Sequence, residues 1–516
     1  MSRTSLTFAL VLALAAVTAS CSSHASGTST PPSSSAPAPT TPPVQHPNIV
    51  FILTDDLSWN LVTPQIAPHI VQLENAGMTF DHYFVADSLC CPSRSTIFTG
   101  LFPHDTQVET NLPPDGGFQK FQSRDLAPRT YAVALHDAGY QTSMLGKYLN
   151  GYGDLTMTPA TAPVPQGWSD WHVSNSSGYF EYDFTQNDNG NVTKYTGPDN
   201  YGVDVLNRAA QSFIRMSATR PFSVEVATYA PHQPYVPAIR NENDFPGLSE
   251  PRDPSFNAAN QDPPSWMADR PPLGPLTIAR LDLIYRKRAQ TVEAVDKLVA
   301  DTEATLAAEH LTDKTYLVFS SDNGYHLGQH RLARGKQTAF DTDIRVPLIV
   351  DGPGVTAGTV DHHVVENVDL YPTFTELAGA TPDRPIDGHS IVPLLLGRQP
   401  VPAWRTVALL EHRHHVASAS DPDNEGGRKN DPTTYEGIRI SAPSLPGFRG
   451  PVESVYVEYA DPKQEVEYYD ITKDPYEIDN IAGSLTSAQR DELQQILHAY
   501  ENCHDASTCW AAGMPM

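Results

Sequence analysis

The sequence predicts an α/β fold with a large, mainly parallel sheet flanked by helices and a smaller C-terminal α+β subdomain that carries an antiparallel sheet. From Pro47 onward, short apolar runs alternate with helical patterns, which is typical of parallel sheets. The chain has 516 residues, of which 40% are hydrophobic, so it can fill a large core. We expect a main domain over residues 46–397 and the subdomain over residues 398–516.

The first 45 residues differ from the rest in composition. Residues 1–20 combine Arg3, an apolar run and a small-residue end, which is typical of an export signal. Residues 21–45 are rich in serine and proline and cannot bury enough apolar surface to fold, so they predict a tether. Thr18–Cys21 resembles a bacterial lipobox, in which the cysteine is lipidated, and ordinary signal cleavage is the alternative. We expect an exported protein, either a cell-surface lipoprotein or a secreted or periplasmic one, that reaches the membrane only through a lipid anchor at Cys21.

Four apolar runs are expected to form neighbouring strands, and each is followed by polar residues. Ligands of open α/β sheets bind beyond the carboxyl ends of the strands, so we expect these residues to meet at one edge. Carboxylate and amide oxygens fit Ca²⁺ first and Mg²⁺ less well, whereas zinc prefers imidazole and thiolate. The alternative is that the aspartates that follow these strands only cap helices or form turns. The runs and the residues after them are 48–54 with Asp55 and Asp56, 141–146 with Lys147, 221–229 with His232, and 316–321 with Asp322 and Asn323.

A helix is expected to begin near Cys90 and Cys91. Pro92 suits the first turn of a helix and Gly100 its end, which places both cysteines at the N-terminus and Arg94 one turn in. A helix N-terminus is a place for an anion. The spacing leaves two other interpretations open, a vicinal disulfide or two buried small hydrophobic residues.

The C-terminal subdomain is expected to contain paired strands and a closing helix. Residues 455–459 and 465–469 have the composition of strands and are separated by a turn. The segment after Thr486 places its apolar residues within Leu493–Leu497 on one helical face. We expect this helix to close the subdomain over the main sheet.

Charge and cysteine content exclude two classes of protein. The chain has 34 Lys and Arg against 60 Asp and Glu, a formal net charge of −26, which excludes a general nucleic-acid binder. Five cysteines are too few for a disulfide scaffold. Cys503 and Cys509 are close enough in sequence to close a small loop in an oxidising compartment, and the sequence leaves that disulfide open.

The segment from Cys90 to Gly100 resembles the motif of the sulfatase family, Cys-x-Pro-Ser-Arg followed by Thr-Gly, in which the first cysteine is oxidised to formylglycine. The resemblance implies an alkaline-phosphatase-like fold and a sulfuric ester hydrolase. Within the family, the chain is most similar to N-acetylglucosamine-6-sulfatases and related heparan 6-sulfatases. This implies 6-O-sulfated N-acetylglucosamine-type sugars or glycosaminoglycan fragments as substrates. Further matches follow in the family's order: Asp55 and Asp56, Gly146 and Lys147, Pro231 and His232, Asp322 to Gly324, Gly335 and Lys336, Asp369 to Thr373, and Asp387 and Gly388.

The resemblance also implies roles for the matched residues. Cys90, which has the required x-Pro-x-Arg spacing, is converted to 3-oxoalanine (Cα-formylglycine) by a maturation machinery. One hydroxyl of the hydrated aldehyde attacks sulfur, and the other later loses its proton to eliminate sulfate. His232 gives a proton to the leaving oxygen, and Arg94 holds the hydrate and a neighbouring carboxylate of the metal site. Lys147 and Lys336 clamp the sulfate. The ligands of the cation are Asp55, Asp56, Cys90, Asp322 and Asn323.

Three features depart from the family or are left open. Leu149 stands where many arylsulfatases have a histidine that contacts formylglycine, so simple aryl sulfates are predicted to be poor substrates. His326 and His330 are expected at the same sheet edge, either near the substrate and cation or as part of the loop structure. Glu411–His415 is rich in histidine, and we expect a solvated loop or a sugar-contacting rim rather than a metal site.

Two other functions remain alternatives. One is a phosphate or phosphonate monoester hydrolase on the same fold. The other is a non-catalytic lipoprotein that binds sulfated glycans, which requires Cys90 to stay a thiol; the complete set of site residues argues against it. The negative net charge favours small saccharides or chain ends over internal positions of sulfated polymers.

Overall fold

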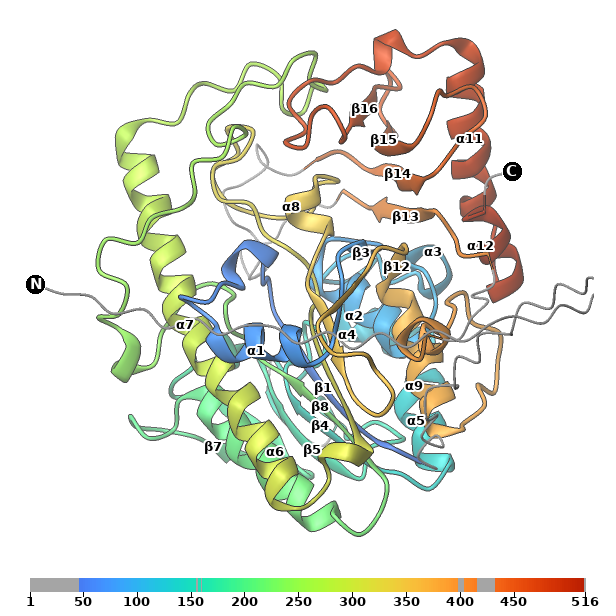
Figure 1. Cartoon of the computed structure of the whole chain (residues 1–516). Coiled ribbons are helices and arrows are strands. Elements are labelled where there is room, and N and C mark those ends of the chain that lie inside the picture. The colour runs from blue at the N-terminus through green and yellow to red at the C-terminus, as the bar shows by residue number, and fades with distance from the viewer. Residues whose placement is uncertain (1–45, 155, 159, 398–402, 415–431, 515–516) are drawn as a thin grey trace, which may run out of the picture. The chain divides into compact units, whose positions relative to one another are not determined.

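The computed structural model describes residues 46–154, 156–158, 160–397, 403–414 and 432–514. A ten-stranded sheet lies between helices, and a four-stranded antiparallel sheet follows toward the C-terminus (Figure 1). The predicted export signal, the tether with Cys21, and His415 lie outside the described residues. None of the described helices is long and apolar enough to cross a membrane.

The large sheet has the strand order β11-β2-β10-β9-β1-β8-β4-β5-β6-β7. Its central strands β9, β1, β8, β4 and β5 are parallel to one another, which confirms the mainly parallel sheet predicted from the sequence. Strands β11 and β2 are also parallel, and the remaining neighbours are antiparallel. The bounds are β1 (Asn48–Thr54), β2 (Met78–Phe80), β4 (Gln141–Gly146), β5 (Asp170–Ser174), β6 (Thr185–Asp188), β7 (Asn191–Lys194), β8 (Phe222–Ala227), β9 (Thr315–Ser321), β10 (Leu348–Asp351) and β11 (Thr359–Asp361). A separate two-stranded sheet pairs β3 (Tyr83–Phe84) with β12 (Val365–Glu366).

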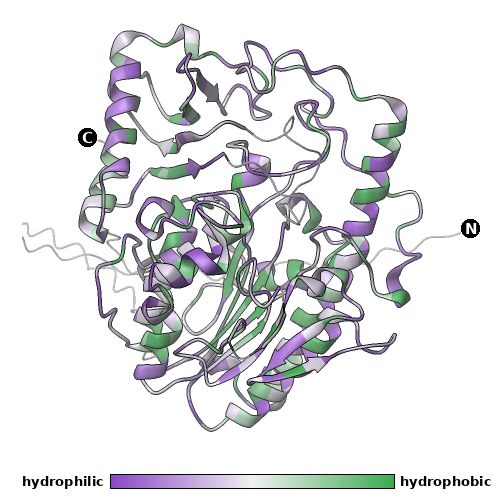
Figure 2. Cartoon of the chain, turned by 180° about the vertical axis from the view of Figure 1, so that it is seen from behind, coloured by the Kyte–Doolittle hydropathy of each residue, from purple (hydrophilic) through white to green (hydrophobic). Residues whose placement is uncertain are grey.

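Alternate residues of β1 face opposite sides of the sheet, because side chains alternate along a strand. Phe51 packs with the helices α2, α5 and α9 on one face, and Ile52 packs with α1, α6 and α7 on the other. All of β1 is buried, as expected for a central parallel strand covered on both faces. In the view from behind, the strands of the sheet, which lie between the helices, consist largely of hydrophobic residues (Figure 2). The α-helices are α1 (Pro68–Ala76), α2 (Cys90–Thr99), α3 (Pro103–Thr106), α4 (Gly117–Ser123), α5 (Tyr131–Asp137), α6 (Gly202–Ser217), α7 (Pro275–Ala308), α8 (Asp341–Ile344), α9 (Leu370–Ala378), α10 (Val392–Leu395), α11 (Ser487–Glu501) and α12 (Ala506–Ala512).

The C-terminal sheet consists of β13 (Val407–His412), β14 (Tyr435–Ala442), β15 (Val452–Tyr459) and β16 (Val466–Asp470) in that order, all antiparallel. The predicted strand pair corresponds to β15 and β16 and is confirmed.

Helix α11 packs differently from the prediction. It begins with a capping box at Thr486 and buries Leu493, Ile496 and Leu497, as expected. These side chains share a core with Leu409 and Ile438 of the C-terminal sheet, so the expectation that the helix closes over the main sheet was wrong. The four-stranded sheet has an apolar face of its own, and the helix covers it. A Cys503–Cys509 disulfide joins the end of α11 to α12.

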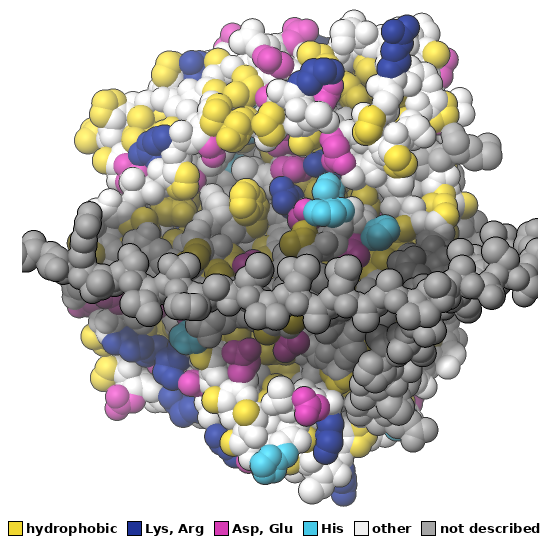
Figure 3. Space-filling view, in the orientation of Figure 1, with side chains coloured by type: hydrophobic (Ala, Val, Ile, Leu, Met, Phe, Trp, Pro, Cys, Tyr) yellow, Lys and Arg dark blue, Asp and Glu magenta, His cyan; other side chains and the backbone are white. Residues whose placement is uncertain are grey.

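The visible surface carries both signs of charge. On the face shown in Figure 3, basic and acidic side chains are interspersed among apolar ones.

Candidate active site

The residues predicted at one sheet edge do meet there. The strands β9, β1, β8 and β4 are neighbours, so the residues that follow them converge beyond their carboxyl ends. Asp55, Asp56, Cys90 and His232 each offer one ligand atom, and these atoms lie within 4.8 Å of one another. All four side chains are buried.

Helix α2 places Cys90 in this cluster. Cys90 is its first residue and Thr99 its last, and Gly100, which follows the helix, has φ 67° and donates its N–H to the Thr96 carbonyl. A Cβ at Gly100 would meet the Tyr371 side chain at 3.0 Å in a conformation that favours glycine. Ser93 Oγ donates to the Asp322 carbonyl oxygen at 2.5 Å and ties the helix to the end of β9. The predicted helix, with the cysteines at its N-terminus, is confirmed.

The two adjacent cysteines have different surroundings. Cys90 Sγ lies 3.1 Å from Asp55 Oδ1 and 2.9 Å from Lys336 Nζ, inside the polar cluster. Cys91 belongs to the hydrophobic core, and burial raises the pKa of its thiol to about 12. Both are thiols in the structure, so the vicinal disulfide is not formed, and the interpretation as a buried small hydrophobe holds for Cys91.

Three buried carboxylates face three buried cations. Lys147 Nζ lies 2.6 Å from Asp55 Oδ2 and Lys336 Nζ lies 2.6 Å from Asp56 Oδ1. Arg94 Nε donates to Asp322 Oδ2 at 2.8 Å, and Arg94 Nη1 donates to the Lys147 carbonyl at 2.9 Å. The positive and negative charges of the site are therefore paired and close to balanced.

The pKa shifts show which charges the cluster stabilises. Burial would raise the pKa of Asp322, but Arg94 and the two lysines hold it below its ordinary range. Burial outweighs Lys147 at Asp55 and raises the pKa of that carboxyl. Burial would lower the pKa of Lys147, but the Asp55 carboxylate outweighs it and raises that pKa. The lysine therefore stays positively charged although it is 2% exposed.

The oxygen donors fit a hard divalent cation. Asp56 Oδ2 and Asn323 Oδ1 are buried and have no hydrogen-bond partner among the described residues. Asn323 Nδ2 donates to Asp56 Oδ1 at 2.7 Å, which turns the amide oxygen away from that carboxylate. Buried polar atoms without partners are costly, and a cation would satisfy them. The donor set, three carboxylates and an amide, suits Ca²⁺ or Mg²⁺ better than zinc.

His232 presents one defined nitrogen to the cluster. Its Nδ1 lies 2.7 Å from the Gln233 carbonyl oxygen. A carbonyl only accepts, so Nδ1 carries a hydrogen and Nε2 is the atom that can exchange a proton. Nε2 lies 3.6 Å from Asp56 Oδ2, and the Tyr179 ring packs against the imidazole at a centroid distance of 4.5 Å.

The two histidines left open serve the loop structure. His326 Nδ1 lies 3.0 Å from Asp343 Oδ2, and its backbone pairs with Gly335, so it supports the loop that carries Lys336. His330 stacks on Phe340 at 3.8 Å, and burial lowers the pKa of its imidazole to about 3.

The expectation of a solvated loop at Glu411–His415 was wrong for its first two residues. Glu411 and His412 are buried at the end of β13, because this strand pairs with β14. Glu411 Oε1 also lies 2.8 Å from His104 Nδ1.

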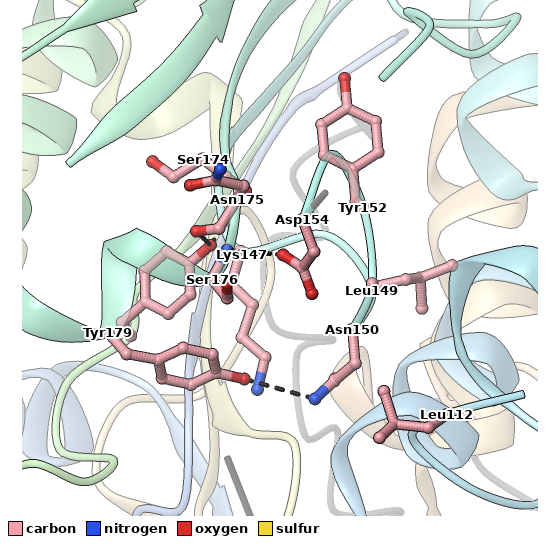
Figure 4. A pocket seen from close by; sticks show the side chains of 12 residues that line it. Leu112, Lys147, Leu149, Asn150, Tyr152, Asp154, Ser174, Asn175, Ser176 and Tyr179 are labelled. Atoms are coloured by element: carbon pink, nitrogen blue, oxygen red, sulfur yellow. Dashed lines mark hydrogen bonds between the residues drawn. The ribbon is translucent and has the colours of Figure 1, made fainter. Parts of the chain in front are cut away.

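Several residues at the site were not predicted from the sequence. Arg288, on α7, donates from Nη2 to the Asp56 carbonyl at 2.5 Å and lies over the Tyr325 ring. Figure 4 shows a pocket beside Lys147, with Tyr179 on one side and Leu112 on the other. Asn150 is the member of this pocket that the sequence could have indicated, because it follows Gly-Lys147-Tyr-Leu directly.

Comparisons of the sequence and the fold with known proteins point to one family. A protein-family model described as Sulfatase matches residues 47–380. The chain is 31% identical over 494 residues to an N-acetylglucosamine-6-sulfatase of Homo sapiens, covering 91% of this chain and 87% of the relative. It is 33% identical over 362 residues to a Drosophila melanogaster protein named Extracellular sulfatase SULF-1 homolog, covering 69% of this chain and 32% of the relative. The solved structure of BT4656 in complex with its substrate D-glucosamine-2-N, 6-O-disulfate matches with a TM-score of 0.73 at 23% identity, covering 88% of this chain and 97% of that one, which confirms the predicted fold class.

Proposed function

The chain belongs to the sulfatase family and is a sulfuric ester hydrolase, and on that premise we propose that it removes the 6-O-sulfate of N-acetylglucosamine-type sugars or glycosaminoglycan fragments. The human relative, named for this activity, supports the choice of substrate. The solved structure with a bound 6-O-sulfated glucosamine supports it as well. The observation that carries the proposal is the position of Cys90, whose Sγ lies among Asp55, Lys336 and the other groups that an enzyme of sulfate esters needs.

Cys90 and a cation supply the reactive groups. We infer that a maturation machinery converts Cys90 to formylglycine, whose hydrate supplies the oxygen nucleophile. Asp55, Asp56, Asp322 and Asn323, with the modified Cys90, would hold the cation, with Ca²⁺ preferred to Mg²⁺. When bound, the cation lowers the pKa of a neighbouring hydroxyl and offsets the negative charge of the ester.

The protein's own side chains bind the sulfate group, hold the site in position and protonate the leaving oxygen. Lys147 and Lys336 hold the sulfuryl oxygens, because Lys336 Nζ lies beside Cys90 Sγ and Lys147 Nζ lies beside Asp55, the carboxylate that contacts Cys90. Arg94 fixes Asp322 and the Lys147 backbone through its rigid fork and so keeps the site in shape. His232 gives the proton from Nε2 to the leaving sugar oxygen.

The domain bounds, the export and the partners of the chain are proposed from its sequence. Residues 46–397 form the catalytic domain and residues 398–516 the C-terminal subdomain. We propose that the chain is exported, either as a cell-surface lipoprotein anchored by a lipid at Cys21 or as a secreted or periplasmic protein after ordinary signal cleavage. The partners are a sulfated saccharide and the maturation machinery, and nucleic acid is not one of them.

A comparison of the sulfate and phosphate esters of the same sugar as substrates tests this function. We expect kcat/KM for sulfate release from N-acetylglucosamine 6-sulfate to exceed that for phosphate release from N-acetylglucosamine 6-phosphate. The opposite order would favour a phosphate or phosphonate monoester hydrolase. Release from neither ester, with Cys90 still a thiol, would favour a glycan-binding protein.

A further inference from the structure

A second group of metal-ligating side chains shares no residue with the active site. Asp81, His82 and His362 each offer one ligand atom, and these atoms lie within 4.8 Å of one another. Asp81 and His82 directly follow β2, and His362 directly follows β11. The group contains two imidazoles and one carboxylate, unlike the oxygen donors that surround Cys90, and no step of the sulfate chemistry uses it.

The backbone holds the two loops of this group side by side. Strands β2 and β11 are paired before the loops, and β3 and β12 are paired after them. Within the loops, the Asp81 N–H donates to the Asp361 carbonyl at 3.2 Å, and the Val365 N–H donates to the His82 carbonyl at 3.0 Å. The three side chains are therefore brought together by the fold itself, and a ligand would not have to order the backbone on binding.

One carboxylate meets both imidazoles. Asp81 Oδ1 lies 2.7 Å from His82 Nδ1, and Asp81 Oδ2 lies 2.8 Å from His362 Nδ1. A cation with nitrogen and oxygen ligands would replace these two contacts by three bonds of about 2.0 to 2.2 Å. The His362 side chain is 71% exposed, so its ring can move to close the remaining distance.

Glu453 of β15 orients the His82 ring from the other side. Its Oε2 lies 3.6 Å from His82 Nε2 and accepts from Arg439 Nη1 at 3.0 Å, and its Oε1 accepts from the Ser441 hydroxyl. A carboxylate beside Nε2 favours a hydrogen on that nitrogen and leaves the lone pair of Nδ1 facing Asp81. Metal-bound histidines are commonly oriented in this way, with a carboxylate at the nitrogen that does not bind the metal.

Another group of similar composition is less suited to a metal. His104, Asp105 and His504 also offer ligand atoms within 4.8 Å of one another. However, His104 Nδ1 lies 2.8 Å from Glu411 Oε1, and His104 Nε2 lies 2.9 Å from the Cys503 carbonyl oxygen. Both nitrogens are engaged with acceptors outside the group, so a metal bound there would break contacts that it does not replace.

We propose that Asp81, His82 and His362 form a binding site for a divalent ion of the zinc type, separate from the hard-cation site at Cys90. Zn²⁺ fits two imidazoles and one carboxylate, with water in the fourth position, whereas Ca²⁺ and Mg²⁺ prefer oxygen ligands. The inference does not depend on the proposed substrate.

The test is a calorimetric titration of the full chain with zinc chloride in the presence of saturating Ca²⁺, which occupies the oxygen-ligand site. His362→Ala and Asp81→Asn each remove one ligand; His362 is exposed and Asp81 is half-buried, so neither change opens the core. The control, His136→Ala, removes an exposed histidine of α5 that lies outside the group.

We expect the wild type and His136→Ala to bind one zinc ion whose Kd rises by at least about a hundredfold in each ligand variant, because loss of even an outer partner of a ligand costs about 10- to 100-fold. Zinc should also raise the melting temperature of the first two proteins and not of the ligand variants. A wild type that binds no zinc, or an unchanged affinity in either ligand variant, would overturn the inference. Sulfate release without added zinc should be equal in all four proteins, and its absence from all four would overturn the proposed function alone.

Discussion

Replacing Lys147 with methionine tests the electrostatic account of the site most sharply. The change keeps most of the side-chain volume and removes one buried charge. Lys147 Nζ lies 2.6 Å from Asp55 Oδ2 and 4.0 Å from Asp322 Oδ2, so a sulfuryl oxygen at the cluster would lie at a similar range. At an effective dielectric constant of about 20, two unit charges about 4 Å apart interact by about 4 kcal/mol. Loss of one fixed donor of this kind lowers kcat by roughly 10² to 10³.

The same substitution also affects stability, and the assay must separate the two effects. Without Lys147, the Asp55 carboxylate stays buried with fewer partners, and breaking a buried pair costs about 3 to 5 kcal/mol. Chemical denaturation measures that loss, and sulfate release is then assayed at a temperature where the variant is folded. Lys314→Met, at an exposed position, is the matched control and should change neither quantity.

One result would refute this reasoning. If folded Lys147→Met hydrolysed the sulfate ester with kcat/KM within about threefold of the wild type, Lys147 would not contribute to the stabilisation of the transition state. The negative charge on the sulfuryl oxygens would then be stabilised by the other cations of the cluster.

Three further outcomes are expected. Chelation of divalent cations should abolish sulfate release, and Ca²⁺ should restore it better than Mg²⁺; full activity in chelator would contradict the cation site. Burial raises the pKa of Glu181 from 4.5 to about 8, so between these pH values the folded state holds a proton that the unfolded state has released, and stability is lost as pH rises from 4.5 to about 8. The melting temperature of the wild type should therefore fall relative to Glu181→Gln between about pH 5 and about pH 8 and run parallel to it above that range; parallel curves throughout would contradict it. Arg405→Met should lower the free energy of unfolding by about 3 to 5 kcal/mol in denaturant titrations, because Glu366 and Asp369 lose their buried partner; a loss below about 1 kcal/mol would contradict it.

The sequence predicts the sheet edge well, because local patterns define it. The buried runs that end at Asp55 and Asp322 are strands in the structure, and parallel pairing places their ends side by side. The helix at Cys90 was predicted from Pro92 and Gly100, whose backbone preferences are local.

The parts that the sequence did not predict depend on contacts between distant segments. Glu411 is buried because β13 pairs with β14, and a run of charged residues gives no sign of such pairing. The position of α11 depends on which apolar face it covers, and its own periodicity shows only that it has one. The pocket of Asn150, Asp154 and Tyr179 gathers side chains from loops, which carry no periodic signal.

The chemical state of Cys90 tests the central claim most directly. The protein is produced with its export and maturation machinery and cleaved before aspartates, which releases the peptide Asp87–His104. Mass spectrometry with fragmentation then locates any change within this peptide. The account predicts an aldehyde at Cys90 and an unchanged thiol at Cys91. Two intact thiols, or a disulfide between them, in protein from its native host would contradict the catalytic account and favour a sulfated-glycan-binding protein.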